Sequence, residues 1–200
     1  MLRGVVAVAA ICVSAACSPG KGSTDAGRAA APAAPWTTLF DGTSLAAWTT
    51  TGDANWQLSD GIVAADMGAG FLVTHEQYGD FELEVEFFVS ADANSGVLLR
   101  CANPAKPGAA TCYEVNIFDQ RKDATYRTGA IVGVAKPSVQ VNAGNQWNTY
   151  HIEAHGRHLV VKLNGQTTVD VEDDKLATGP IGLQYAGGQV KFRSVRIRAQ

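Results

Sequence analysis

Two neighbouring segments in the middle of the chain carry charged side chains that could do acid–base chemistry. Arg100 ends the segment NSGVLLR (residues 94–100), Glu114 lies within CYEVNI (residues 112–117), and Asp119 follows shortly after. A carboxylate can serve as a general base, and a guanidinium can stabilise an anion that forms beside it. Glu114, Arg100 and Asp119 are therefore the candidate catalytic residues.

Side-chain alternation predicts which residues of these segments share a face. Arg100 lies on the face of Asn94 and Gly96, and Glu114 lies on the face of Asn116. A register with Arg100 opposite Glu114 would join the two sets, and Gly96 would leave room for a ligand. A register with Cys101 opposite Cys112 would instead set Arg100 opposite Tyr113. Both registers stay open, and so does a purely structural Arg100–Glu114 ion pair.

Other polar residues have both a functional and a structural interpretation. Gln184 and Tyr185 could hydrogen-bond to and stack on a sugar, although Tyr185 could equally pack in the core. Asp119 could cap a turn instead of acting as an acid or base. Three carboxylates alternate with apolar residues over residues 81–87 and are expected to form a solvated strand face; these are Glu82, Glu84 and Glu86.

The elements that would position these residues are short strands. Apolar and polar residues alternate over residues 81–87 and 150–155, which is typical of half-buried strands. Asp60-Gly61 and Asn164-Gly165 lie between apolar runs and predict two tight hairpins. The apolar alternation slips between Phe192 and Val195, which predicts a bulge. No long helical period occurs after residue 35, so we expect one antiparallel β-sandwich over residues 36–200.

The N-terminal segment has the features of an export signal. A short basic start and an apolar stretch precede the small residues Ser14-Ala15-Ala16 and then Cys17. We expect residues 1–17 to be a signal peptide with a lipobox, lipidated at Cys17; a soluble secreted form is the alternative. Residues 18–35 are rich in Ala, Pro and Gly and are expected to be a tether. The protein is therefore expected to be periplasmic or anchored in the outer membrane, contacting membrane only through lipid.

Export changes the interpretation of the cysteines. Cys101 and Cys112 are the only pair in the predicted domain, and such a pair in an oxidising compartment is expected to form a disulfide. Two cysteines without a suitably spaced His make a poor zinc site. Nothing in the sequence requires a cofactor; a divalent cation is conceivable but no acidic loop specifies one. With 16 Lys and Arg against 19 Asp and Glu, no nucleic-acid surface is expected.

A series of motifs resembles one bacterial domain family, the 3-keto-disaccharide hydrolases. The opening LFDGTSL (residues 39–45) followed by Trp48 resembles the family's start, and FRSVRI (192–197) resembles its close. Further motifs in the same order are YGDFEL (78–83), NSGVLLR (94–100), YEVNI (113–117), TGA (128–130), LNG (163–165) and GPIGLQ (179–184). The resemblance covers nearly all of residues 36–200.

This resemblance implies an all-β, antiparallel jelly-roll sandwich of the concanavalin-like lectin and glucanase type. It also implies cleavage of glycosides whose C3 hydroxyl is already a ketone, by removal of the C2 proton, 1,2-elimination and hydration. Glu114 would then be the base, Arg100 would hold the enolate oxygen, and Asp119 would be in reserve. Asn94, Asn116, Gln184 and Tyr185 would bind the sugar. Many relatives carry a His at the position of Ala186, and the cysteine pair is not general in the family.

Two other classes of function remain alternatives. The same fold supports sugar binding without catalysis, so a carbohydrate-binding module would use the same face. A purely structural envelope protein would show no convergence of polar side chains. The oligomeric state and the identity of the sugar are left open by the sequence.

Overall fold

The computed structural model of the chain describes residues 1, 2, 4 and 34–200. The expected signal peptide, Cys17 and most of the tether lie outside these residues. The described part of the domain consists of strands and a single turn of 3-10 helix, η1 (Ala124–Tyr126). No helix within this part has the length and apolar character needed to cross a membrane.

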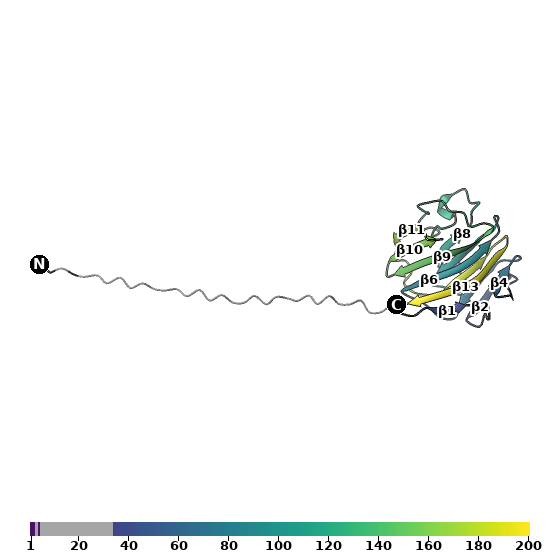
Figure 1. Ribbon diagram of the computed structural model, residues 1–200, viewed down its shortest axis with the longest axis horizontal. Coiled ribbons are helices and arrows are strands. Elements are labelled where there is room, and N and C mark those ends of the chain that lie inside the picture. Colours follow the sequence, from purple (N-terminus) through teal and green to yellow (C-terminus); the bar gives the residue numbers. More distant parts are fainter. Residues whose placement is uncertain (3, 5–33) are drawn as a thin grey trace. The chain divides into compact units, whose positions relative to one another are not determined.

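Eight strands form the larger sheet. Their order is β11-β10-β9-β6-β13-β4-β3, and β1 pairs with the part of β13 that β4 leaves free. The bounds are β1 (Thr37–Phe40), β3 (Gln57–Ser59), β4 (Ile62–Ala65), β6 (Phe81–Val89), β9 (Gln146–His155), β10 (His158–Leu163), β11 (Gln166–Glu172) and β13 (Val190–Ala199). Figure 1 shows the long strands β9, β6 and β13 side by side in this sheet.

Five strands form the smaller sheet, in the order β2-β5-β12-β7-β8. The bounds are β2 (Trp48–Gly52), β5 (Gly70–Thr74), β7 (Ser95–Leu99), β8 (Tyr113–Ile117) and β12 (Gly182–Tyr185). Every named strand pairing in both sheets is antiparallel, so the all-β, antiparallel sandwich expected from the sequence is confirmed.

The core lies between the two sheets and is built from alternate residues of each strand. In β6, Phe81, Leu83, Val85 and Phe87 are fully buried, whereas the intervening glutamates are only partly buried. Phe87 stacks on Tyr150 with ring centroids 5.0 Å apart. The Tyr150 hydroxyl donates a 2.7 Å hydrogen bond to the carbonyl of Asn116, which links β9 to β8 across the sandwich. The period-two pattern of the sequence therefore sets which side of each strand is available to a ligand.

The local turn predictions also hold. Asp60-Gly61 and Asn164-Gly165 connect β3 to β4 and β10 to β11, and all four residues have positive φ, as a type I′ hairpin requires. The register of β13 against β6 shifts between Phe192 and Ser194, where the sequence predicts a bulge. Trp48 is buried and its indole N–H donates to the carbonyl of Leu39, so the opening motif fixes β1 against β2.

Cys101 and Cys112 form the expected disulfide, with Cα atoms 4.1 Å apart. The bond closes the loop that joins β7 to β8, and Ala102 N–H donates to the Thr111 carbonyl just inside the ring. Both cysteines are buried against Leu98, with Phe71 of β5 packed beside them. The loop is therefore attached to the face of the five-stranded sheet that points away from the core.

We predict that reducing this disulfide destabilises the domain without unfolding it. Closing a loop of this length stabilises by about 3 kcal/mol on the chain-entropy argument, and the sandwich core does not depend on it. Chemical denaturation with and without a reductant, with the near-ultraviolet circular dichroism spectrum as the probe, measures the difference. A native spectrum in the reductant at zero denaturant is expected, and its loss would contradict the prediction.

Candidate functional site

The register between β7 and β8 decides which polar residues meet. Leu98 lies opposite Glu114, and Gly96 lies opposite Asn116. Both registers considered from the sequence are therefore wrong, because neither of them places Glu114 opposite Leu98. The disulfide joins residues at the end of the hairpin rather than a directly opposed pair, so it gave no information about the register.

A row of five residues crosses the outer face of the five-stranded sheet, the face that points away from the core. Successive pairings join Thr51 to Phe71, Phe71 to Gln184, Gln184 to Gly96, and Gly96 to Asn116. Directly opposed residues in neighbouring strands point to the same side of a sheet. We call this set the cross-sheet row. It combines one aromatic ring, three hydrogen-bonding side chains and one position with no side chain.

Glu114 belongs to the adjacent row but leans over Gly96. A Cβ atom at position 96 would lie 3.1 Å from Cγ and 3.3 Å from Oε1 of Glu114. The carboxylate thus occupies the space that any larger residue at position 96 would fill. This space brings it to Gln184, whose side chain hydrogen-bonds to it.

The environment of Glu114 favours its protonated form. The residue is only 8% exposed, and burial raises the pKa of the carboxyl above its usual value. Hydrogen bonds from the Gln184 side chain and from the Ala109 backbone N–H act in the opposite direction but are the smaller effects. Ala109 lies in the disulfide-closed loop, so this loop contributes to the surroundings of the carboxylate. A carboxyl with a raised pKa is suited to accept and return a proton.

A pocket of about 260 Å³ lies over the same face. Residues of β2, β5 and β12 form one side, and Ala105, Lys106 and Pro107 of the disulfide-closed loop form the other. Gln184 Oε1 and Thr51 Oγ1 are both buried and have no hydrogen-bond partner. Both residues line this pocket, so it presents two polar atoms that a hydroxyl-bearing ligand could satisfy.

The two asparagines of the candidate site differ in their surroundings. Asn116 is buried, and its side-chain amide donates a 2.5 Å hydrogen bond to the Tyr126 carbonyl, so it anchors the η1 turn. Asn94 is partly buried and precedes β7, where its backbone bonds to Ala186 and Gly187. Ala186 itself lines the pocket and is exposed. The position at which many relatives carry a His is therefore at the pocket, and here it offers no titratable group.

Arg100 does not reach the site, contrary to the sequence-based expectation. It has φ of 49°, so the strand ends there and the alternation that assigned its face no longer applies. Its guanidinium is fully buried and donates to the carbonyls of Gly79, Gly156 and Leu176. One further bond of 3.1 Å reaches Asp80 Oδ1. Arg100 thus ties three loops together, and because its guanidinium is fully buried among them it is not available to an enolate.

Asp119 is also a structural residue, so its assignment as reserve acid or base is corrected. Its two oxygens accept hydrogen bonds from the backbone N–H groups of Ala143 and Gly144, at 2.8–3.1 Å. The Thr128 hydroxyl is a third donor, with a bond of 2.5 Å to Asp119 Oδ1. These bonds use the carboxylate to fix two loops, which is the turn-capping alternative.

Tyr185 points into the core rather than to a sugar, so its assignment as a sugar-binding residue is corrected. It is 3% exposed, packs edge-on against Trp56, and donates its hydroxyl to the Gly188 carbonyl. Gln184, its neighbour in β12, necessarily points the other way and belongs to the cross-sheet row. The core-packing alternative for Tyr185 is therefore the correct one.

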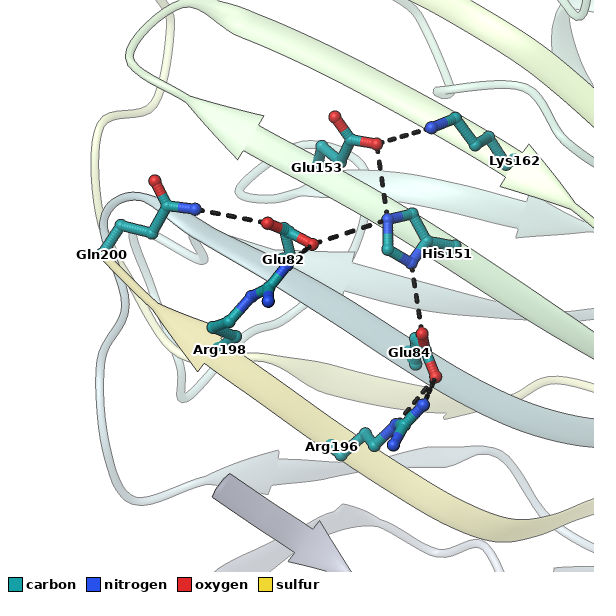
Figure 2. Close-up of polar contacts among 8 residues, drawn as sticks. All are labelled: Glu82, Glu84, His151, Glu153, Lys162, Arg196, Arg198 and Gln200. Carbon is teal, nitrogen blue, oxygen red and sulfur yellow. Dashed lines mark hydrogen bonds and ion pairs between the residues drawn. The ribbon is translucent and has the colours of Figure 1, made fainter. Parts of the chain in front are cut away.

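The outer face of the eight-stranded sheet carries the other concentration of charge (Figure 2). Glu82 and Glu84 pair with Arg198 and Arg196 of β13, as Figure 2 shows. Glu86, which the figure does not include, pairs with Arg193 of the same strand. His151 lies within 3.3–3.8 Å of Glu82, Glu84 and Glu153, and Lys162 bonds to Glu153 at 2.6 Å. Each glutamate already has a cationic partner, so this face is the solvated strand face expected from the sequence. No group of three His, Cys, Asp or Glu residues within the described part of the chain has the arrangement of a metal site.

Several residues of the pocket carry no recognisable signal in the sequence. Thr51 and Phe71 lie in strands whose partners are distant along the chain, and only the sheet order brings them to Gln184. Lys106 lies in the loop between the cysteines and is its only charged residue. The predicted disulfide could have pointed to this loop, because a short ring closed next to Glu114 can adopt few positions away from it.

The sequence profile of the 3-keto-alpha-glucoside-1,2-lyase-like domain matches residues 35–198, which is most of the chain. A comparison with curated protein sequences finds no match.

Solved structures of the same architecture include candidate glycosyl hydrolases and a binding module. Two crystal structures of candidate glycosyl hydrolases from Parabacteroides distasonis ATCC 8503 superpose with TM-scores of 0.74 and 0.71, at 21% and 25% identity. They cover 82% and 83% of this chain, and 94% and 100% of their own. The carbohydrate binding module CBM66 from Bacillus subtilis has a TM-score of 0.59 at 15% identity, covering 84% of this chain and 97% of its own. The jelly-roll fold expected from the sequence is thus confirmed.

We predict that Arg100→Met lowers the free energy of unfolding by about 3 kcal/mol, because it leaves loop carbonyls without donors and Asp80 without its partner. Urea denaturation of the variant and the parent gives the difference. A variant of parental stability would show that the guanidinium does not hold these loops.

We also predict a pH-dependent difference in stability between the parent and Glu114→Gln. Because burial raises the pKa of Glu114, the folded state binds this proton more tightly than the unfolded state does. The parent's unfolding free energy therefore falls as pH rises above about 4.3, the usual glutamate value, through the folded pKa. The glutamine variant lacks this loss, so its stability relative to the parent should increase over that interval. Denaturation of both proteins at a series of pH values tests this. A variant whose free energy of unfolding, relative to that of the parent, falls as pH rises would contradict it.

Proposed function

The chain belongs to the 3-keto-alpha-glucoside-1,2-lyase-like domain family, and we propose that it cleaves 3-keto-glycosides at the pocket beside Glu114. One observation carries the proposal. A buried carboxyl with a raised pKa touches a glutamine that also lines a pocket with unsatisfied polar atoms. The combination provides a proton acceptor and a place for a hydroxyl-bearing ring.

The proposed reaction starts with proton removal at C2 of the sugar. The neighbouring C3 ketone makes this proton acidic, since the electron pair left on C2 delocalises onto the ketone oxygen as an enolate. Glu114 takes the proton. The enolate then re-forms the C3 carbonyl, and its electron pair becomes the second bond between C1 and C2. The C1–O bond breaks at the same time, and the leaving oxygen takes a proton from a water molecule, whose hydroxide is neutralised by the proton held on Glu114. Addition of water across the resulting C1=C2 bond gives net hydrolysis, without the oxocarbenium route of ordinary glycosidases.

Sugar recognition in this proposal rests on the cross-sheet row. Gln184 Oε1 would accept a hydrogen bond from a sugar hydroxyl, and Thr51 Oγ1 would donate or accept another. Phe71 lies between these two residues in the row and offers an apolar surface to the ring. The same side chain of Gln184 would thus position both the sugar and the base.

A carbohydrate-binding module is the second candidate function, favoured by the structural similarity to CBM66. The unsatisfied pocket atoms fit either function, whereas a buried carboxyl beside them is needed only for catalysis. Binding of a sugar without turnover of any 3-keto-glycoside would select this alternative.

We further propose that the protein is exported and anchored through lipidated Cys17. The proposal is supported by the signal-like N-terminal sequence and by the disulfide, which persists in oxidising compartments. Radiolabelled palmitate incorporation that Cys17→Ser abolishes would support the anchor, and unchanged incorporation would contradict it.

For the catalytic assignment, we predict that Glu114→Gln lowers turnover of a 3-keto-glucoside by about 100-fold or more, because the amide cannot accept the C2 proton. Substrate binding should survive, since glutamine keeps the shape and the bond to Gln184. Turnover is followed through the absorbance of the enone product. In the parent, kcat/KM should rise with pH through a pKa above the usual glutamate value, because the base must be deprotonated.

Asp119→Asn is the matched control. Asp119 follows the same strand as Glu114, but its carboxylate accepts hydrogen bonds from loop backbone. The substitution should therefore lower the free energy of unfolding and leave the turnover of the folded protein unchanged. A Glu114→Gln variant with parental turnover would place the base elsewhere. Parental protein inactive on every 3-keto-glucoside tested would overturn the enzyme proposal itself.

A further inference from the structure

The disulfide-closed loop, residues 102–111, has the sequence ANPAKPGAAT, in which Lys106 is the only charged residue. Proline follows Lys106 directly and also occurs at position 104. A residue before proline is largely confined to extended backbone conformations, so Lys106 has little local freedom. Such a loop presents one ammonium group from a stiff backbone.

Bonds within the loop fix the backbone at Lys106. Its N–H donates to the Asn103 carbonyl, and its own carbonyl accepts a 2.8 Å bond from the Thr111 hydroxyl. The Cys101–Cys112 disulfide closes the ring behind these bonds. The direction in which the Lys106 side chain leaves the loop is therefore defined by covalent and hydrogen-bonded constraints.

The loop brings this cation to the pocket that serves Glu114. Lys106 and Gln184 both line the pocket, and the Gln184 side chain hydrogen-bonds to the Glu114 carboxylate. Ala109, three residues further along the loop, donates its backbone N–H to the same carboxylate. Among the described residues that line the pocket, Lys106 is the only charged one. Within the described residues it forms no ion pair, so its charge is available.

The chemistry proposed for this site needs such a charge. When Glu114 removes the C2 proton, one negative charge moves from the carboxylate to the C3 oxygen of the sugar. The expected partner for that oxygen, Arg100, is fully buried, and its guanidinium is bonded to loop carbonyls and Asp80. An ammonium placed in the pocket can stabilise the enolate more than the neutral ketone, which is the condition for accelerating the step.

We propose that Lys106 is a catalytic residue that stabilises the enolate oxygen through its ammonium group. The assignment rests on the proposed function, since it concerns the same pocket and the same reaction. It adds a role for the disulfide, which would hold the stabilising cation at the site. The proton lost from C2 stays on Glu114 at this step, and Lys106 remains protonated throughout.

The test compares Lys106→Met with Lys106→Arg on a 3-keto-glucoside. The methionine variant should lose about 100-fold in kcat with little change in KM, because the ground-state ketone is neutral. The arginine variant keeps the charge and should stay within about tenfold of the parent. Lys106 is exposed and its side chain makes no hydrogen bond in the described structure, so both variants should fold with parental stability.

Exchange of the C2 hydrogen distinguishes the enolate role from other roles of a lysine. In deuterium oxide, Lys106→Met should slow loss of the C2 proton signal in parallel with glycoside cleavage. Normal exchange combined with slow cleavage would show that Lys106 acts on the leaving group, and parental rates of both would show that it has no catalytic role. Either result overturns the assignment.

Lys191→Met is the matched control. Lys191 lies over the Phe88 ring on the eight-stranded sheet, so its removal should leave turnover unchanged. If the parent is active and Lys106→Met is equally active, only the assignment of Lys106 is wrong. A parent without activity on any 3-keto-glucoside defeats the proposed function, and the two failures are thereby distinguished.

Discussion

The arrangement of the candidate site depends on the missing side chain at position 96. Because Gly96 has no Cβ, the Glu114 side chain can lean across β7 and reach Gln184 on β12. Any other residue there would lie within 3.1 Å of Glu114 Cγ. A carboxylate that would otherwise lie over its own strand, β8, instead lies over the neighbouring strand β7, on the side of β12. Burial then raises the pKa of this carboxylate, and the cross-sheet row supplies polar neighbours beside it.

The two outer faces of the sandwich show why a buried carboxylate matters more than a count of charges. The eight-stranded sheet carries far more charge, but its glutamates are matched by arginines, a lysine and His151 at close range (Figure 2). Such partly exposed pairs contribute little individually, and they already neutralise the glutamates of this face. The five-stranded sheet has one carboxylate, one nearby loop cation and two polar atoms without partners. Function is better supported where the hydrogen bonding is incomplete.

Local patterns predicted most of the fold and only part of the site. Alternation in β6 and the Asp-Gly and Asn-Gly turns report short-range physics, so they could be identified without any knowledge of strand order. Glu114 and Gln184 were identified because alternation also sets their direction. Arg100 was misplaced because alternation was extended one residue past the end of β7, into a left-handed backbone conformation. Lys106 and Thr51 depend on long-range pairing and loop packing, which no local pattern contains.

The disulfide connects the stability of the domain with the arrangement of the pocket. A sandwich with an extensive inter-sheet core has little need of a bond that closes so short a ring, since much of its stability comes from buried apolar area. The same bond has a larger effect on the loop, whose residues are mostly exposed and bury little apolar surface of their own. Without it, the Ala109 N–H and the Lys106 ammonium would be held only by hydrogen bonds within the loop. The disulfide therefore acts mainly on the preorganisation of the site, because it restricts a loop that approaches both the carboxylate and the pocket.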